Sequence, residues 1–357
     1  MTLAQKKVVL LLKRWFLIVF IFAMLLSGQS VRGAGEPAVS AKAAVVYDSA
    51  YGRVLYEKNA HEKMLIASTT KIMTAVVALE QGNVDDVVKV TAEMANVEGS
   101  SMYLQVGEEY TLRELLYGLM LASGNDAATA IAVHIAGNVG KFAELMNAKA
   151  AELGLENTHF ENPHGLDGAT HYSTALDMAR LMDYALSRSD FSEIAGARNV
   201  TVKGLTYVNH NKLLWQCEGV IGGKTGYTMA AGRTLVTCCE REGRRLICVT
   251  LSAPDDWNDH RSLYDWAYST YDSRVLVDSG TRYLLPLFYG DGRKIAVEPL
   301  RDVTVYAAAK DEADYVIELP RFAFGPVYAG DRAGRILVRL NGRTVEEVPL
   351  VYMENSE

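Results

Sequence analysis

The hydrophobic pattern of the chain changes its period twice, and this order of elements limits the folds that the chain can adopt. Residues 41–59 read as two strands joined by a turn at Ser49–Gly52. Helical patterns follow, and short strands return from about Val200. Strands, then helices, then more strands imply an antiparallel sheet with helices packed on it, an α+β fold.

The middle of the chain is expected to hold most of the helices. One begins near Ser68 and ends at Gln81, before Gly82 and Asn83. Residues 111–136 read as two apolar helices interrupted at residues 123–125. Further helices are predicted at 141–153, 173–188 and 259–271, with a strand hairpin turning at Glu242–Gly243 between the last two.

After about residue 274 the pattern alternates in period two, and no helix-length apolar stripe occurs. Asp291–Gly292 and Asn341–Gly342 are typical hairpin turns. We therefore expect a first domain at 38–272 and a small all-β domain at 275–357.

The first 34 residues have the pattern of a secretory signal peptide. Four basic residues precede twelve uninterrupted apolar ones, "WFLIVFIFAMLL", and the small-residue segment "SGQSVRGAG" follows. The apolar run has the length of a signal sequence and is short for a membrane span. We expect cleavage between Ser30 and Gly35 and an extracytoplasmic protein; the alternative is retention as an N-terminal anchor.

The charge of the mature chain argues against two classes of partner. Removing the signal lowers the basic count from 36 to 31 against 43 acidic residues, a net charge near −12. This balance does not suit nucleic acid or a polybasic membrane contact. A C-terminal membrane helix would need an apolar stripe at helical spacing, whereas the terminal "RTVEEVPLVY" alternates like a strand. Membrane contact is expected at most through an uncleaved N-terminal segment.

Neither the four cysteines nor the seven histidines are spaced like metal ligands, so no metal or cofactor is expected. In the predicted hairpin, Cys239 and Cys248 would lie diagonally on one face, which is usually too far apart for an unstrained disulfide. We interpret all four cysteines, which include Cys217 and Cys238, as small buried hydrophobic residues.

Ser68 and Lys71 form the only Ser-x-x-Lys motif in the chain. The simplest interpretation is a helix-capping serine followed by a solvated lysine. However, the helix after Lys71 is apolar nearly all round, and a lysine in a buried helix is costly unless something uses it. Positions i and i+3 share one helix face, so the amine can reach the hydroxyl. A desolvated amine can activate a serine as nucleophile.

Two other short motifs also occur once each. Ser123-Gly124-Asn125 could simply cap two helices, or it could supply a hydroxyl for proton transfer and an amide for holding a substrate. Lys224-Thr225-Gly226 could belong to an ordinary strand. On a sheet edge it could instead bind a carboxylate, while the glycine allows close approach of a peptide.

The order and spacing of these three motifs resemble those of penicillin-binding proteins and class A β-lactamases. The chain is most similar to the serine-type D-alanyl-D-alanine carboxypeptidases, the low-molecular-mass penicillin-binding proteins. Segments 162–181, 209–228 and 231–254 resemble the family's sequence around the second and third motifs, and 327–351 its β-rich C-terminal domain. The resemblance implies a penicillin-binding/β-lactamase-like transpeptidase fold.

The resemblance also implies substrates and roles. The substrates would be peptidoglycan stem peptides ending in D-Ala-D-Ala, and β-lactam antibiotics would be covalent inhibitors. The resemblance implies that Ser68 is the nucleophile, that Lys71 is its general base and that Ser123 transfers a proton to the leaving D-alanine. It further implies that Asn125 binds a substrate amide and that Lys224 and Thr225 bind the terminal carboxylate, while Gly226 allows the strand to approach closely. The backbone N–H groups of Ser68 and Tyr227 would form the oxyanion hole.

Two alternatives remain. A class A β-lactamase needs a glutamate in a Glu-x-x-Leu-Asn context to activate the deacylating water, and residues 126–223 contain no such motif. A non-catalytic β-lactam sensor or wall-binding module could retain the same pocket. Rapid steady-state penicillin turnover would indicate the first, and labelling without D-alanine release the second.

Overall fold

A computed structural model describes residues 35–288 and 292–356, and its main feature is one antiparallel sheet. The strands, in spatial order, are β2 (Arg53–Lys58), β1 (Ala43–Asp48), β9 (Arg244–Leu251), β8 (Gly232–Arg241) and β7 (Val220–Thr228). Strands β1 and β2, which precede the helices, therefore share one sheet with β7, β8 and β9, which follow them. This confirms the predicted α+β arrangement, and β7 lies at an edge.

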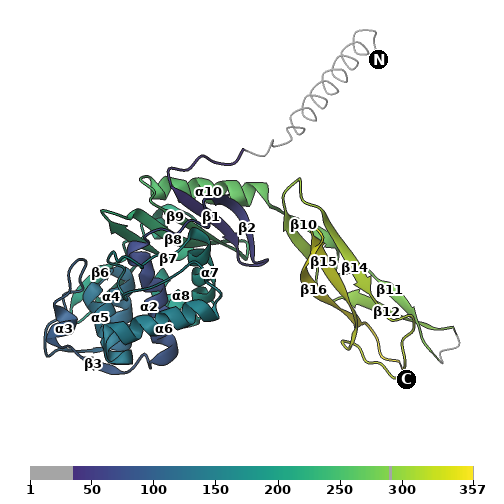
Figure 1. The fold of residues 1–357 in the computed structure, drawn as a ribbon. Helices are drawn as coiled ribbons and strands as arrows, with labels where there is room; N and C mark the ends of the chain where they lie inside the picture. The colour runs from purple at the N-terminus through teal and green to yellow at the C-terminus, as the bar shows by residue number, and fades with distance from the viewer. Residues whose placement is uncertain (1–34, 289–291, 357) are drawn as a thin grey trace, which may run out of the picture. The chain divides into compact units, whose positions relative to one another are not determined.

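Strand β1 shows why both faces of the sheet are covered. All six of its residues are buried. Ala43, Val45 and Tyr47 pack into one hydrophobic cluster, whereas Ala44 and Val46 pack into another, as the period of a strand requires. The first cluster holds the helices that follow β2, and the second holds α10 (Asp256–Thr270). Figure 1 shows α10 on the opposite side of the sheet from α2 and α8.

The predicted helices are present, with small differences at their ends. They are α2 (Lys71–Gln81), α4 (Leu112–Leu121), α5 (Asn125–Ala136), α6 (Val139–Glu152) and α7 (Ala175–Leu186), together with α10. A further helix, α8 (Ser189–Gly196), was not predicted. Shorter elements complete this part of the chain: η1 (Ala67–Thr70), α3 (Ala92–Ala95), α9 (Leu213–Gln216), and the two-stranded pairs β3 (Val87–Lys89) with β4 (Glu109–Thr111) and β5 (Asn199–Val202) with β6 (Leu205–Val208).

The β8–β9 hairpin turns where the sequence predicted. Glu242 and Gly243 both have positive φ, 53° and 74°. Cys239 pairs with Leu246 and Thr237 with Cys248, so the two cysteines are diagonal neighbours, and both are free. Cys238, Cys239 and Cys248 are buried as expected, but Cys217 is only half-buried, because it follows the short helix α9 at the surface.

The C-terminal part forms two sheets around a hydrophobic cluster of its own. One pairs β10 (Asp272–Val277) with β13 (Val303–Ala307); the other has the order β11 (Tyr283–Pro286), β12 (Lys294–Pro299), β16 (Arg343–Tyr352), β15 (Arg332–Leu340) and β14 (Ala313–Glu318). Asn341 and Gly342 form the predicted turn, with φ of 51° and 78°. Asp291 lies outside the described residues. The predicted boundary at 272–275 falls at the start of β10 and stays a prediction.

The segment interpreted as a signal peptide also lies outside the described residues. Within residues 35–288 and 292–356, no helix combines the length and apolar character that a membrane crossing needs.

Candidate active site

Ser68 lies in η1, one turn before Lys71 begins α2. Neither helix start has a side-chain cap, so the interpretation of Ser68 as a helix-capping residue is wrong. The residue before it, Ala67, has a φ of 47°, in the left-handed region that residues with a Cβ rarely adopt. This turn directs Ser68 into a cleft.

Lys71 is completely buried, and its amine has three polar neighbours. Nζ lies 2.7 Å from Asn125 Oδ1, 2.7 Å from the carbonyl oxygen of His164 and 3.0 Å from Ser68 Oγ. The first two oxygens can only accept hydrogen bonds. A neutral amine has two N–H bonds and one lone pair. If the two N–H bonds are donated to these oxygens, the lone pair is left facing the Ser68 hydroxyl.

The electrostatics of the site favour that neutral amine. Burial and the nearby Lys224 hold the pKa of Lys71 well below its ordinary value, although Asp126 opposes the shift. Lys224 is itself almost fully buried and donates from Nζ to its neighbour Thr225 O at 2.8 Å. Burial lowers the pKa of Lys224 to about 7.

Ser123 and Asn125 lie at the break between α4 and α5, as predicted. Ser123 has a φ of 58° and lines the same cleft as Ser68. Asn125 does not cap α5; its Nδ2 donates to Glu98 O at 2.6 Å, which fixes the amide orientation and turns Oδ1 towards Lys71. The capping interpretation of this motif is therefore wrong for Asn125.

Strand β7 comes close to the serine because position 226 is a glycine. A Cβ there would lie 2.3 Å from Thr234 Oγ1 and 2.9 Å from the backbone nitrogen of Ser68. Thr234 Oγ1 in turn donates to Ile66 O at 3.0 Å, which ties β8 to the segment before η1. Thr225, Gly226 and Tyr227 all line the cleft, and Tyr227 is 66% exposed.

We expect Gly226→Ala to lower the rate of penicillin acylation by about 10- to 100-fold, because β7 or η1 must move to accommodate the methyl group. Overpacking of this kind typically costs about 1–3 kcal/mol, so the melting temperature should also fall. Stopped-flow acylation and thermal unfolding measure the two effects. Gly140→Ala in α6 is the control, since its Cβ would meet only Asn138 Oδ1 at 3.4 Å; equal effects of both substitutions would contradict the close-approach argument.

Several supporting residues were missed by the sequence analysis. Buried Asp126 accepts hydrogen bonds from Ser101 Oγ and from the backbone N–H groups of Met102 and Leu104, and so holds the loop beside Asn125. The carbonyl of His164 has no side-chain signature and could not be recognised from sequence. An acid directly after the Ser-x-Asn motif was the only available signal for Asp126.

The loop that carries His164 is fastened to α2 and η1. Thr74 Oγ1 donates to Pro163 O at 2.6 Å, and Thr70 Oγ1 lies 2.7 Å from His171 Nε2. His171 Nδ1 accepts from the backbone N–H of Glu161, and burial lowers the pKa of His171 to about 4. The neutral imidazole is therefore a structural connection that keeps the His164 carbonyl against Lys71.

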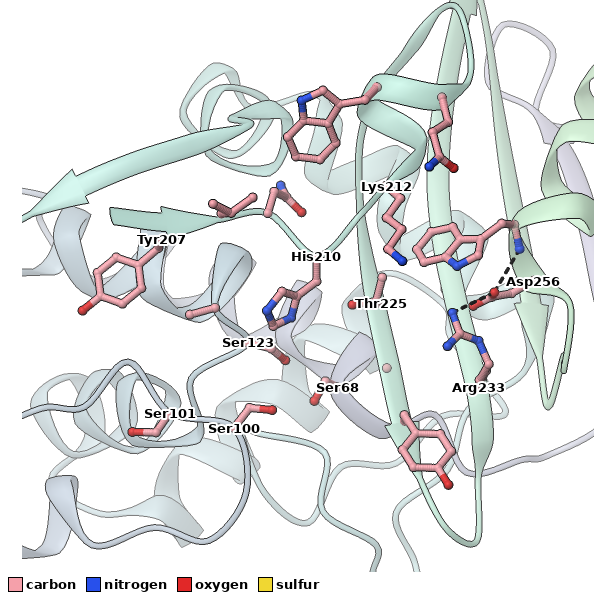
Figure 2. A pocket seen from close by; sticks show the side chains of 18 of the residues that line it. Ser68, Ser100, Ser101, Ser123, Tyr207, His210, Lys212, Thr225, Arg233 and Asp256 are labelled. Atoms are coloured by element: carbon pink, nitrogen blue, oxygen red, sulfur yellow. Dashed lines mark hydrogen bonds and ion pairs between the residues drawn. The ribbon is translucent and has the colours of Figure 1, made fainter. Parts of the chain in front are cut away.

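The cleft has a volume of about 1130 Å³ and extends well beyond the three motifs. Figure 2 shows Ser68, Ser123 and Thr225 facing the same space, with Tyr207 and His210 on one side and Arg233 and Asp256 on the other. The edge strand β7 lines this cleft through Thr225, Gly226 and Tyr227. In the described part of the chain, no group of three or more His, Cys, Asp or Glu side chains could hold a metal ion.

Comparison with known proteins identifies the family. A profile described as D-alanyl-D-alanine carboxypeptidase matches residues 30–255. The chain belongs to the D-alanyl-D-alanine carboxypeptidase family. It is 33% identical over 344 residues to the D-alanyl-D-alanine carboxypeptidase DacF of Bacillus subtilis, covering 92% of this chain and 88% of the relative. The corresponding values for DacC of Escherichia coli are 34% over 345 residues, 90% and 85%.

Solved structures agree with this membership. The fold matches penicillin-binding protein 5 of Haemophilus influenzae with a TM-score of 0.70 and 28% identity, covering 90% of this chain and 99% of that one. The D-alanyl-D-alanine carboxypeptidase DacD of Francisella tularensis gives a TM-score of 0.67 and 26% identity, covering 91% and 95%. The predicted fold class and the predicted family are confirmed.

Proposed function

We propose that the protein is a serine D-Ala-D-Ala carboxypeptidase that removes the terminal D-alanine from peptidoglycan pentapeptide stems and is acylated by β-lactams. The observation that carries the proposal is the arrangement around Lys71, whose two carbonyl-type neighbours leave the amine lone pair for Ser68. Such a pair generates a serine nucleophile without a histidine or a metal. Family membership supplies the substrate class.

The acylation step uses the three motifs together. Lys71 takes the proton of Ser68 as Oγ attacks the carbonyl carbon of the penultimate D-alanine. The backbone N–H groups of Ser68 and Tyr227 stabilise the resulting oxyanion, at about 3 kcal/mol for each donor. Ser123 relays the proton that Lys71 has taken to the leaving amine, the C–N bond breaks, and D-alanine departs.

The remaining residues bind the substrate. Asn125 holds a substrate amide, while Lys224 and Thr225 receive the terminal carboxylate. Because β7 is the edge strand of the sheet, its backbone can pair with the stem peptide as an added strand. Water then hydrolyses the acyl-enzyme, which restores the Ser68 hydroxyl and releases the shortened stem.

Release of D-alanine from a pentapeptide ending in D-Ala-D-Ala tests this function directly. We expect D-alanine to accumulate at many turnovers per enzyme, whereas penicillin should label one site and turn over slowly. Rapid steady-state penicillin hydrolysis would indicate a β-lactamase, and penicillin labelling without D-alanine release would indicate a binding module.

We also propose that the enzyme is exported and that residues 1–34 are its signal peptide. The division into two domains at residues 272–275 is a further part of the proposal. Expression in a bacterial host, fractionation and N-terminal sequencing of the mature protein test the export proposal. We expect an extracytoplasmic protein that begins between residues 31 and 35. A mature protein that retains "WFLIVFIFAMLL" would indicate an anchor instead.

A further inference from the structure

The half-buried Cys217 lines a second surface cleft, to which none of the three motifs contributes. Arg241 and Arg261 also line this cleft. Cys217 directly follows the last residue of α9, and the two residues before it, Trp215 and Gln216, line the cleft that holds Ser68. A change at Cys217 would therefore act on a short helix that forms part of the wall of the active site.

Cys239 of β8 lies beside Cys217 in the fold. The Val220 N–H donates to Cys217 O at 3.3 Å, so residues 217–220 form a tight turn, and Val220 pairs with Cys239. The sulfurs of Cys217 and Cys239 lie 3.9 and 3.5 Å from the same oxygen, Glu218 O, so they are no further apart than the sum of these distances. Cys239 belongs to the hydrophobic cluster on the α10 face, and Cys217 packs against that cluster.

A glycine leaves room between the turn and the buried sulfur. Gly219 has a φ of 84°, and a Cβ at this position would lie 3.0 Å from Cys239 Sγ. The other two cysteines are placed less favourably. Cys238 points the opposite way, because successive residues of a strand face opposite sides, and it packs into the cluster on the other face of the sheet. Cys248 is only a diagonal neighbour of Cys239, which is usually too far for an unstrained disulfide.

The simpler interpretation is that all four cysteines only fill the core, and it does not account for a half-buried thiol in a cleft. We propose that Cys217 and Cys239 form a disulfide in the exported protein, and that this bond fixes the end of α9 against β8. The inference does not depend on the catalytic proposal. It takes from the proposed export the oxidising surroundings in which disulfides persist.

The oxidant would be a small-molecule disulfide, which Cys217 can meet in the second cleft. The Cys217 thiolate attacks one sulfur of that molecule, a mixed disulfide forms, and the other half leaves as a thiolate. The Cys239 thiolate then attacks Cys217 Sγ and displaces the second half. Two protein thiols are oxidised, one disulfide is reduced to two thiols, and the protons of Cys217 and Cys239 go to the two leaving thiolates.

The experiment incubates the folded, reduced enzyme with oxidised glutathione and digests it with trypsin without reduction. Burial raises the pKa of Cys217 and raises that of Cys239 to about 11, so the reaction is run at about pH 9, where more thiolate is present. We expect a protein about 2 Da lighter than the reduced form, with residues 213–224 linked to residues 234–241. The melting temperature should rise by about 3–8 °C and fall again on reduction.

Cys238→Ala and Cys239→Ala are a matched pair, because the two residues are adjacent, buried and on the same tryptic peptide. Cys238→Ala should keep the cross-link and the thermal shift, whereas Cys239→Ala should lose both and retain at most a glutathione adduct on Cys217. A wild-type protein that forms no cross-link, keeps glutathione on Cys217, or links Cys248 instead would overturn the assignment. None of these results involves D-alanine release, so failure here is distinguishable from failure of the proposed function.

Discussion

Ser68→Ala should abolish both D-alanine release and covalent labelling by penicillin. Loss of a serine nucleophile typically costs at least about 10⁴-fold in rate, because no other atom can form the acyl-enzyme. The substitution removes one oxygen at a half-buried site that caps no helix, so the free energy of unfolding should change by less than about 1 kcal/mol. Thermal unfolding would show that the fold is intact.

Mass spectrometry identifies the acylated residue independently of the rate. After penicillin treatment and proteolysis of the wild-type protein, one adduct should appear, on the peptide that contains Ser68. Thr69 and Thr70 are on the same peptide, so fragmentation must locate the adduct. Ser123 serves as a useful comparison, since it faces the same cleft. An adduct on Ser123 or on any residue other than Ser68 would remove Ser68 from the mechanism.

Lys71→Arg should be nearly as damaging as Lys71→Ala. Arginine stays protonated, so it keeps the positive charge but cannot take the proton of Ser68. A general base typically contributes about 10²- to 10⁴-fold, and we expect a loss of this size in the rate of penicillin acylation. Lys224→Arg is the matched control, because Lys224 is also a buried lysine but is proposed mainly to present charge to a carboxylate. Its loss should be smaller.

The pH dependence offers a second test of Lys71. Acylation requires the neutral amine, and the pKa of Lys71 is lowered well below 10.5 by burial and by Lys224. Acylation should therefore begin at a pH far below the ordinary lysine range, increase as the pH rises through the folded-state pKa, and decline on acidification. Near-normal acylation by Lys71→Arg, with the same pH profile, would exclude proton abstraction by Lys71.

The sequence predicted the outline of the fold because each signal was local. The turn at Glu242–Gly243 and the break at residues 123–125 depend on neighbouring residues, and both are present in the structure. The three motifs were recognisable for the same reason. The sequence could not identify the hydrogen-bond and ion-pair partners that lie far away in the chain.

Two contacts illustrate that limit. The His164 carbonyl that orients the Lys71 amine is 93 residues away in sequence, and a backbone oxygen has no residue type by which to recognise it. The ion pair of Arg233 with Asp256 joins β8 to the start of α10, two elements that no short sequence pattern places together. Both contacts depend on the register and packing of distant segments, which short patterns do not specify.

The backbone at Ala67 and Ser123 has a consequence for how such an enzyme can evolve. Both residues adopt the left-handed conformation, at about 1–2 kcal/mol each relative to an ordinary turn. The surrounding helices must therefore supply enough stability to keep two unfavourable turns in place beside the cleft. Glycine would relieve the strain at either position, but at position 123 it would remove the hydroxyl proposed for proton transfer, and at position 67 it would loosen the turn before Ser68. Thermal stability and catalytic rate should consequently be in conflict at these two positions. Substitutions in the C-terminal sheets are better suited to raising the melting temperature.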